Sequence, residues 1–353
     1  MDIVIDEKIP FLKQALEKMG HNVLAKPGVE ICAADVKEAQ ALFVRTRTKC
    51  GTSLLHGSKV RFVGTATIGY DHIDSGYCAA NGIVWANAAG CNSGAVLQYI
   101  QSVLYAWSKI KNRSLEGLVL GVVGVGEIGS KVAAWAHEAG MRVLLNDPPR
   151  ERRDGPDGFV PLSRIAEECD IVTFHPTLNP CGEFKTYHLA GPVFFSSLRR
   201  CLLLVNASRG PVVDNAALKA AIESGVVGDA VLDVWEGEPD IDVSLLNKVF
   251  VGTPHIAGYS LEGKMNATRL VLEAFASFTG FQGELPLPEL APPAQESVVA
   301  SSLSAALLDI YDPLKDCRAL KENPAAFEEL RNNYALRREP VSYRLCVKNV
   351  GKC

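Results

Sequence analysis

The chain has 353 residues, of which 48% are hydrophobic, enough for two or three domains with substantial cores. Its formal net charge is −4 at pH 7, which argues against a protein that binds nucleic acid through a basic surface. No apolar run reaches the ~18 residues of a membrane span, and the start M-D-I-V-I-D shows no signal peptide. Ten cysteines occur without C-x-x-C or zinc-ligand spacing. We therefore expect a cytoplasmic protein with no metal site, no nucleic-acid partner and no membrane segment, whose cysteines mostly fill the core.

Short apolar strands alternate with helices in the first part of the chain, which predicts an α/β fold with a parallel sheet. The strands are expected at 2–6, 22–25, 41–44, 60–64 and 83–86, with an amphipathic helix over 10–19. Thr46, Thr67 and Asn87 follow three of these strands. Because ligands of such sheets gather at the carboxyl ends of the strands, these polar residues predict the mouth of a pocket.

A glycine-rich stretch then links two strands through a helix. An apolar strand over 118–123 precedes Gly124, Gly126 and Gly129, which form G-x-G-x-x-G. A helix is expected over 130–139 and a second strand over 141–146, followed by Asp147. The glycines permit a tight turn, close approach to a pyrophosphate and close helix packing. The order of elements predicts a dinucleotide site, and an acid at position 147 favours NAD over NADP.

Further strands are expected at 170–174, 201–205, 230–234 and 249–252, with a charged loop over 148–158. A helix over 260–280 is expected to return to the first domain. The proline-rich segment 283–294 reads as a linker. The region after about 296 has a helical pattern to 338 and a strand-like 340–347. It is short for an independent core, so we expect it to pack on the main body or on a second subunit.

Three titratable side chains follow the later strands: Arg209, Glu238 and His255. A dehydrogenase of hydroxy acids needs a base for the hydroxyl proton, which suits histidine. It also needs a carboxylate to fix the imidazole tautomer and a guanidinium to grip the substrate carboxylate. Spacing alone does not show that the three side chains meet. Arg209 could also be a surface charge, Glu238 a solvated acid and His255 a hydrogen-bonded loop residue.

The order of the motifs G-V-G-E-I-G, N-A-S-R-G-P-V-V-D, V-L-D-V-W-E-G-E-P and T-P-H-I-A-G resembles the NAD-dependent D-2-hydroxyacid dehydrogenase family over most of residues 40–280. The resemblance implies a Rossmann-type doubly wound NAD domain over 93–255 and a flavodoxin-like substrate domain formed by 1–92 and 256–281. It implies that His255 is the acid/base, that Glu238 pairs with it and that Arg209 binds the substrate carboxylate. The implied NAD positions are Gly124, Gly126, Glu127, Ile128, Gly129, Asp147, His175, Ala207, Ser208, Arg209, Asp233 and Gly258.

Further motifs, among them R-T-R-T-K, V-G-T-A-T-I-G-Y-D-H-I-D and the tail F-E-E-L-R-N-N-Y-A-L-R-R-E, resemble one branch of that family. This implies 4-phospho-D-erythronate as the substrate, in pyridoxal phosphate biosynthesis. It also implies a small C-terminal α+β dimerisation domain over 282–353 in a homodimer. The implied substrate positions include Thr46, Thr67 and Tyr259.

The segment R-T-R-T-K suits a phosphate because Arg45, Arg47 and Lys49 offer cationic donors beside a hydroxyl. With a period of two, these three share one face and Thr46 and Thr48 the other, unless the strand has already ended. We predict that at least one of the three cations binds the phosphate. The alternatives for the whole chain are another D-2-hydroxyacid dehydrogenase, of the phosphoglycerate or glycerate type, and a non-catalytic NAD-sensing protein.

Overall fold

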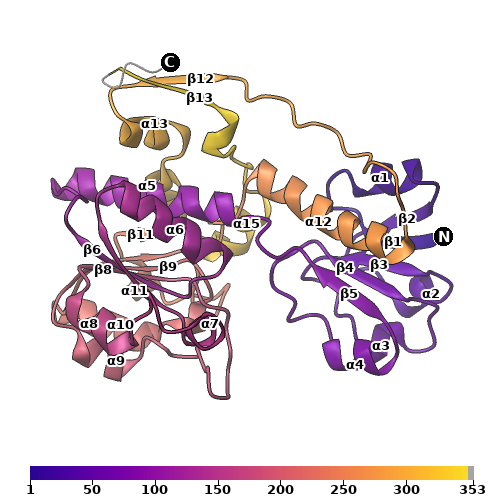
Figure 1. Ribbon diagram of the computed structural model, residues 1–353, viewed down its shortest axis with the longest axis horizontal. Helices are drawn as coiled ribbons and strands as arrows, with labels where there is room; N and C mark the ends of the chain where they lie inside the picture. The colour runs from indigo at the N-terminus through magenta and orange to yellow at the C-terminus, as the bar shows by residue number, and fades with distance from the viewer. Residues whose placement is uncertain (349–353) are drawn as a thin grey trace. The chain divides into compact units, whose positions relative to one another are not determined.

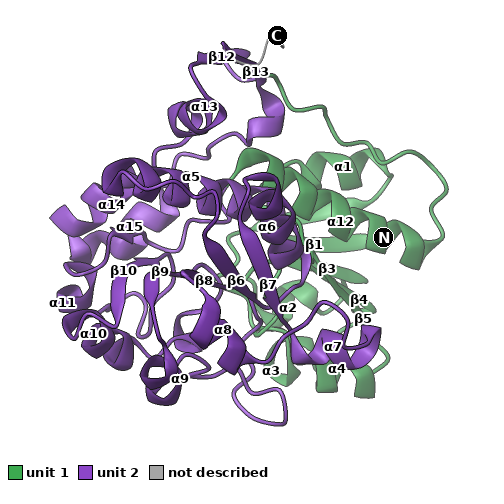
Figure 2. Ribbon diagram, turned by 60° about the vertical axis from the view of Figure 1, so that its left-hand side comes forward, with its two compact units in different colours: residues 1–92, 260–292 green, residues 93–259, 293–353 purple. Residues whose placement is uncertain are grey.

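The computed structural model describes residues 1–348 and divides into two compact units. Unit 1 comprises residues 1–92 and 260–292, and unit 2 comprises residues 93–259 and the chain from 293 onward (Figures 1 and 2). We expected the chain to pass from the first domain to the second after residue 92, as it does, but to return to the first domain at residue 256. We also expected residues 282–353 to form a separate domain. The structure instead groups the C-terminal region with the unit of the glycine-rich stretch. That this region acts as a domain of its own stays a prediction.

Unit 1 is built on a five-stranded parallel sheet of strand order β2-β1-β3-β4-β5. This is the doubly wound flavodoxin-like order that the sequence analysis predicted. The strands are β1 (Asp2–Asp6), β2 (Asn22–Lys26), β3 (Ala41–Val44), β4 (Phe62–Thr65) and β5 (Val84–Asn87). The helices are α1 (Leu12–Lys18), α2 (Ala33–Val36), α3 (Thr52–Leu55), α4 (Ser75–Ala80) and α12 (Leu261–Thr279).

The long helix α12 covers one face of this sheet, as expected for a helix that returns to the first domain. Ser260 caps its first turn by accepting the N–H of Gly263 at 2.8 Å, and Gly280 ends it in a left-handed conformation. The ring of Phe275 is fully buried, and its centroid lies 5.3 Å from those of Phe43 and Phe62. An aromatic cluster therefore fastens α12 to β3 and β4.

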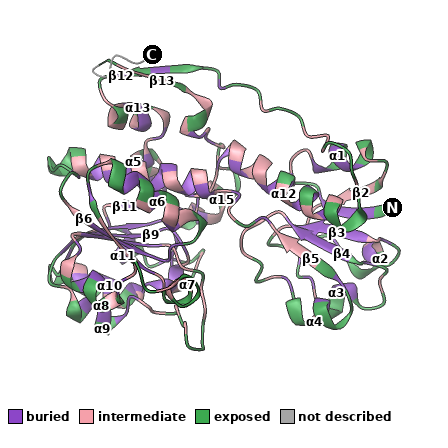
Figure 3. Ribbon diagram, in the orientation of Figure 1, coloured by how far each residue is buried: buried purple, intermediate pink, exposed green. Residues whose placement is uncertain are grey.

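Unit 2 holds a six-stranded parallel sheet of order β11-β10-β9-β8-β6-β7, whose strands are buried between helices (Figure 3). The strands are β6 (Val119–Val123), β7 (Arg142–Asn146), β8 (Ile171–Phe174), β9 (Cys201–Asn206), β10 (Val227–Leu232) and β11 (Val251–Gly252). The helices are α5 (Ser93–Lys111), α6 (Glu127–Glu138), α7 (Pro148–Asp154), α8 (Leu162–Glu168), α9 (Pro192–Ser197), α10 (Asn215–Glu223) and α11 (Val243–Leu246).

The chain runs from β6 outward to β7 and then crosses to β8 on the opposite side of β6. The direction of winding therefore reverses at β6, as in the doubly wound Rossmann-type sheet that we predicted. In such sheets a crevice opens at the carboxyl ends of the strands on either side of the reversal.

The C-terminal region is α+β, as expected, and packs on the rest of unit 2. Its elements are β12 (Ser297–Ala300), α13 (Leu303–Ile310), α14 (Pro313–Glu322), α15 (Phe327–Asn332) and β13 (Arg344–Val347). Helix α13 packs on α5, and α14 packs on β11. Leu320 and Phe327 are fully buried in the core of unit 2. We expected the C-terminal region to pack on the main body or on a second subunit, and the structure shows that it packs on the main body.

Two local predictions were wrong. The expected charged loop after Asp147 begins with helix α7, because Asp147 caps the helix and proline is well tolerated at its first positions. Strand β12 was missed because its parallel partner β13 lies more than 40 residues away, and short-range patterns do not register such pairing. Within residues 1–348, none of the helices combines the length and the apolar composition that crossing a membrane requires.

We predict that Phe275→Ala lowers the free energy of unfolding by about 3–5 kcal/mol, because it leaves a cavity between α12 and the sheet. Urea denaturation of the full chain measures the change. The matched control is Phe278→Ala, one turn further along α12, where the side chain is 37% exposed and the loss should be clearly smaller. Equal losses in the two variants would contradict the anchoring role of Phe275.

Candidate functional site

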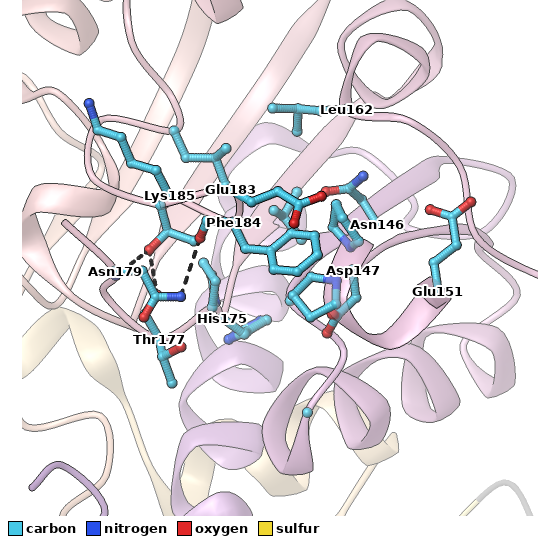
Figure 4. Close-up of a pocket in the computed structure, with 18 of the residues that line it drawn as sticks. Asn146, Asp147, Glu151, Leu162, His175, Thr177, Asn179, Glu183, Phe184 and Lys185 are labelled. Carbon is cyan, nitrogen blue, oxygen red and sulfur yellow. Dashed lines mark hydrogen bonds between the residues drawn. The ribbon is translucent and has the colours of Figure 1, made fainter. Parts of the chain in front are cut away.

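A cavity of about 890 Å³ opens in unit 2 at the carboxyl ends of β6 and β8, where the winding reverses (Figure 4). Asn146, Asp147 and Glu151 lie on one side of it, and Thr177 and Asn179 lie on the other (Figure 4). The glycine-rich loop and His175 complete the part of the wall nearest the strands. The predicted dinucleotide site is therefore a preformed cavity.

The three glycines of the loop meet different steric demands. Gly124 has a φ of 86°, and a Cβ there would overlap the backbone of Pro176. A Cβ on Gly129 would overlap the carbonyl oxygen of Gly124, so only glycine lets α6 pack this closely on the turn. A Cβ on Gly126 would meet nothing within 4 Å. The loop is therefore tightly built and leaves open space at Gly126, before the N-terminus of α6, where a pyrophosphate binds in such folds.

Asp147 binds the backbone of the glycine-rich loop. Its carboxylate accepts the N–H of Val125 at 2.8 Å and the N–H of Arg150 at 3.0 Å. Each carboxylate oxygen has two lone pairs, so both can still accept a ribose hydroxyl. The side chain thus links the loop, helix α7 and the cavity, as an acid that selects NAD should.

His175 sits in the cavity wall at the end of β8. Its Nε2 lies 2.9 Å from Oγ1 of Thr173, while Nδ1 is buried and has no hydrogen-bond partner. Burial lowers the pKa of His175 to about 3, so the ring is neutral at physiological pH. An unsatisfied buried nitrogen in a cavity wall is unfavourable unless a ligand completes it. Together with the open space at Gly126, this nitrogen fits a bound NAD.

His255 and Glu238 form a hydrogen-bonded pair. Nδ1 of His255 lies 2.8 Å from Oε2 of Glu238, whose Oε1 accepts the N–H of Trp235 at 2.9 Å. A carboxylate can only accept, so Nδ1 carries the proton and Nε2 remains a base. Burial alone would raise the pKa of Glu238, but the bond and charge of His255, the Trp235 N–H and the charge of Arg331 together lower it. The carboxylate therefore stays ionised beside the imidazole.

The loop that carries His255 is fixed from inside by Asp233. This carboxylate is buried and accepts the Thr253 hydroxyl at 2.7 Å and the N–H groups of Ile256 and Ala257 at 2.8 and 2.9 Å. Its observed role is therefore to hold the loop. The predicted NAD contacts of Asp233 and of Gly258, which follows this loop, stay predictions.

Arg209 follows β9, the strand beside β10. It is half-buried, and its Nη1 donates to the carbonyl of Ser208 at 2.8 Å. Asn206 shapes this turn, since its Oδ1 accepts from both the backbone and the hydroxyl of Ser208. Arg209, Glu238 and His255 thus follow the adjacent strands β9, β10 and β11, and the direct contact is the one between Glu238 and His255. The predicted NAD contacts of Ala207 and Ser208 stay predictions.

The predicted substrate residues of unit 1 lie after β3 and β4. Strand β3 ends at Val44, and the N–H of Thr48 bonds back to the carbonyl of Arg45 in a turn. The two-residue alternation that we considered for this segment therefore does not apply. Arg45 is held by Asp6, with Nε 3.1 Å from the carboxylate, whereas Thr46, Arg47 and Lys49 are exposed. In the second turn, the hydroxyl of Thr67 donates to the carbonyl of Gly69 at 2.8 Å.

Sequence reasoning missed Arg331, which α15 brings close to the His255–Glu238 pair. Its Nε donates to the hydroxyl of Tyr259 at 3.3 Å, and its Nη1 lies 3.9 Å from the Glu238 oxygen that faces His255. The signal was present in the tail motif F-E-E-L-R-N-N-Y, but we read that motif only as part of a dimerisation domain. Arg331 joins the C-terminal region to a predicted substrate residue and to the predicted catalytic carboxylate.

His188, Asp214 and Glu236 form a group whose ligand atoms lie within 4.8 Å of one another. Asp214 already accepts the N–H of Ala217 and caps α10, and Glu236 accepts the N–H of Asn215. Both carboxylates thus have structural roles at the start of α10. The expectation of no metal site stays a prediction.

Comparison with known families and proteins gives a consistent result. The family model described as D-isomer specific 2-hydroxyacid dehydrogenase, NAD binding domain, matches residues 96–257. A protein of Bacteroides thetaiotaomicron named erythronate-4-phosphate dehydrogenase is 50% identical over 98% of this chain and 99% of its own length. A protein of the same name from Porphyromonas gingivalis is 40% identical over 97% of this chain and 95% of its own length.

Solved structures share the fold at low sequence identity. A D-lactate dehydrogenase of Aquifex aeolicus complexed with NAD and lactic acid matches with a TM-score of 0.62 at 23% identity, over 82% of this chain and 100% of that one. A 3-phosphoglycerate dehydrogenase of Entamoeba histolytica with bound NAD⁺ matches with a TM-score of 0.66 at 23% identity, over 82% and 99% of the two chains. These matches confirm the predicted fold.

We predict that Asp147→Ser weakens NADH binding about tenfold or more, since a hydrogen bond to a charged group contributes about 1.5–3 kcal/mol. Serine still caps α7, so the loss reports on the ligand and not on the helix. The preference for NADH over NADPH should fall as well, because the charge that repels a 2′-phosphate is gone. Fluorescence titration with both cofactors measures this. Asp154→Ser, at the other end of α7, is the control and should leave both affinities unchanged.

Proposed function

Because the chain belongs to the erythronate-4-phosphate dehydrogenases of the D-2-hydroxyacid dehydrogenase family, we propose that it oxidises 4-phospho-D-erythronate at C2. The product is 2-oxo-3-hydroxy-4-phosphobutanoate, and NAD is the acceptor. The observation that carries the proposal is the hydrogen bond between His255 and Glu238, in the same unit as the dinucleotide cavity. The step belongs to pyridoxal phosphate biosynthesis, on the basis of the family resemblance.

The chain's own residues supply the acid–base chemistry. Nε2 of His255 takes the proton of the C2 hydroxyl, and Glu238 stabilises the imidazolium that results. Arg209 grips the substrate carboxylate through two parallel hydrogen bonds and so orients C2. Gly124, Gly126 and Asp147 would hold NAD at the cavity, and the bound cofactor would supply the acceptor for the hydride of C2.

The family relatives bear on the alternatives. Curated proteins at 40–50% identity carry the erythronate-4-phosphate name, and they match nearly the full chain, including the C-terminal region. A phosphoglycerate or glycerate dehydrogenase gains no such support. A non-catalytic NAD sensor would not need the ionised Glu238 beside His255. Comparing NADH production with 4-phosphoerythronate, 3-phosphoglycerate and glycerate, each with a 2-oxo acid present as a control, separates the three possibilities.

A homodimer formed through the C-terminal region is part of the proposal. Its β12 and β13 form a two-stranded parallel sheet, an arrangement that is marginally stable without further packing. Val299 on β12 is 58% exposed, and Leu303 at the start of α13 is 46% exposed. A second copy of the region would cover these apolar side chains. The expected compartment is the cytoplasm, where a small-molecule biosynthetic step of this kind takes place.

We predict that His255→Ala lowers kcat by a factor of 10²–10⁴, the usual contribution of a general acid–base residue. Steady-state assays with 4-phosphoerythronate measure kcat, and fluorescence titration should show nearly unchanged NADH affinity. His137→Ala removes an exposed histidine of α6 and serves as the control. Near-normal turnover of the His255 variant would refute the assignment.

For the phosphate, we predict that at least one of Arg45→Ala, Arg47→Ala and Lys49→Ala raises KM for 4-phosphoerythronate about tenfold or more. Charge-assisted bonds to phosphate are strong, and the exposed cations of the turn after β3 can adapt to one. KM for unphosphorylated erythronate should change much less. Lys13→Ala, an exposed lysine of α1, is the control. Equal losses on both substrates in all three variants would contradict this site.

A further inference from the structure

The backbone next to His255 is held from two opposite sides. On one side, Asp233 accepts the N–H groups of Ile256 and Ala257. On the other side, Arg337 of the C-terminal region donates to the carbonyl oxygens of the same two residues, at 3.0 Å for Ile256 and at shorter range for Ala257. Ile256 and Ala257, the two residues that follow His255, are thus each bound through both the N–H and the carbonyl oxygen.

Arg337 is itself held rigidly. Its Nε donates to Oε1 of Gln98 at 2.9 Å, and its Nη2 also donates to the carbonyl of Ala95 at 3.0 Å, both on α5. The guanidinium lies over the ring of Tyr311, 4.4 Å from the centroid. The residue is only 8% exposed. One side chain therefore ties the C-terminal region, α5 and the loop after β11 together.

Stability alone explains this arrangement poorly. A buried guanidinium loses its hydration, and well-packed apolar residues often serve a core as well as buried charges do. What Arg337 provides is several directed donors at fixed angles, which an apolar residue cannot supply. Such donors suit a loop whose conformation must be exact.

His255 has need of such support. Its φ of 58° lies in the left-handed region, which non-glycine residues adopt at a cost and keep only when the surroundings fix them. In that conformation its ring reaches Glu238. If the carbonyls of the next two residues were free, the loop could relax and the ring could leave the carboxylate.

We propose that Arg337 is a positioning residue for the catalytic histidine, through which the C-terminal region sets the geometry of the His255–Glu238 pair. The role in catalysis rests on the proposed function, whereas the effect on the loop does not. Arg337 touches neither the imidazole nor the carboxylate in this arrangement and acts only through the backbone.

The test compares Arg337→Met with Lys321→Met. Lys321 is also a cation of the C-terminal region that donates to a backbone carbonyl outside that region. Its acceptor, however, is Val249, which lies before β11 and not in the loop after it. We expect Arg337→Met to lower kcat about tenfold or more, since small misplacements of a catalytic group have large effects on rate. KM should change less than threefold, Arg337→Lys should recover part of kcat, and Lys321→Met should keep kcat within twofold of the parent.

Hydrogen–deuterium exchange of the full-length protein gives a readout without turnover. We expect faster exchange of the amides of Ile256 and Ala257 in Arg337→Met and unchanged exchange there in Lys321→Met. Unchanged exchange in the Arg337 variant, or equal kcat losses in both variants, overturns the proposal. If the parent protein does not oxidise 4-phosphoerythronate while the exchange result holds, the proposed function fails and the positioning of the loop stands.

If Arg337→Met does not fold, Gln98→Met tests the same point more gently, because it removes one holder of the guanidinium and leaves the charge in place. The expected result is the same pattern at smaller size, with a lower kcat and faster exchange at Ile256 and Ala257. A Gln98 variant with parental kcat and parental exchange overturns the proposal.

Discussion

The conformation of the loop that carries His255 depends on one buried carboxylate. Asp233 accepts three hydrogen bonds, from the hydroxyl of Thr253 and from the N–H groups of Ile256 and Ala257. An unpaired carboxylate in a protein interior is strongly unfavourable, so the chain after β11 has to fold around it. His255 lies between these contacts and is thereby fixed in its left-handed conformation. The position of the imidazole is therefore a consequence of satisfying a buried charge.

The C-terminal region contacts the same loop. The loop after β11 offers N–H groups on the side of Asp233 and carbonyl groups on the other side, and these carbonyls also need donors. Arg337 supplies them, and Arg331, six residues earlier, comes within 3.9 Å of Glu238. A region that sequence reasoning treated as an assembly domain thus contacts Glu238 directly and holds the backbone of the two residues after His255.

Much of the fold could be predicted because its signals are local. Gly124 takes a φ of 86° that favours glycine, Gly129 packs against the carbonyl oxygen of Gly124 in the same turn, and the buried strands read as short apolar runs. The pairing of His255 with Glu238 could be expected only from family resemblance, since a separation of 17 positions in the sequence says nothing about a 2.8 Å contact. Arg331 and Arg337 were missed because their roles depend on contacts with residues that are distant in the sequence. Both lie in a charged stretch for which we predicted a helix, and arginines there look like solvated residues until tertiary packing brings the partners, here Tyr259 and Ala257, to them.

The cofactor loop and the predicted substrate site place different requirements on the sequence. At the cofactor loop, the restriction is on the backbone, because a methyl group at Gly124 or Gly129 would overlap the main chain. Proteins that act on other acids can therefore share the fold at 23% identity, as the matches with a TM-score of 0.62–0.66 show. We propose that the substrate depends instead on side chains outside this loop, including at least one of Arg45, Arg47 and Lys49 after β3, and on the C-terminal region, which the relatives at 40–50% identity retain. Substrate choice can then change without disturbing the cofactor site, because the two requirements fall on different parts of the chain.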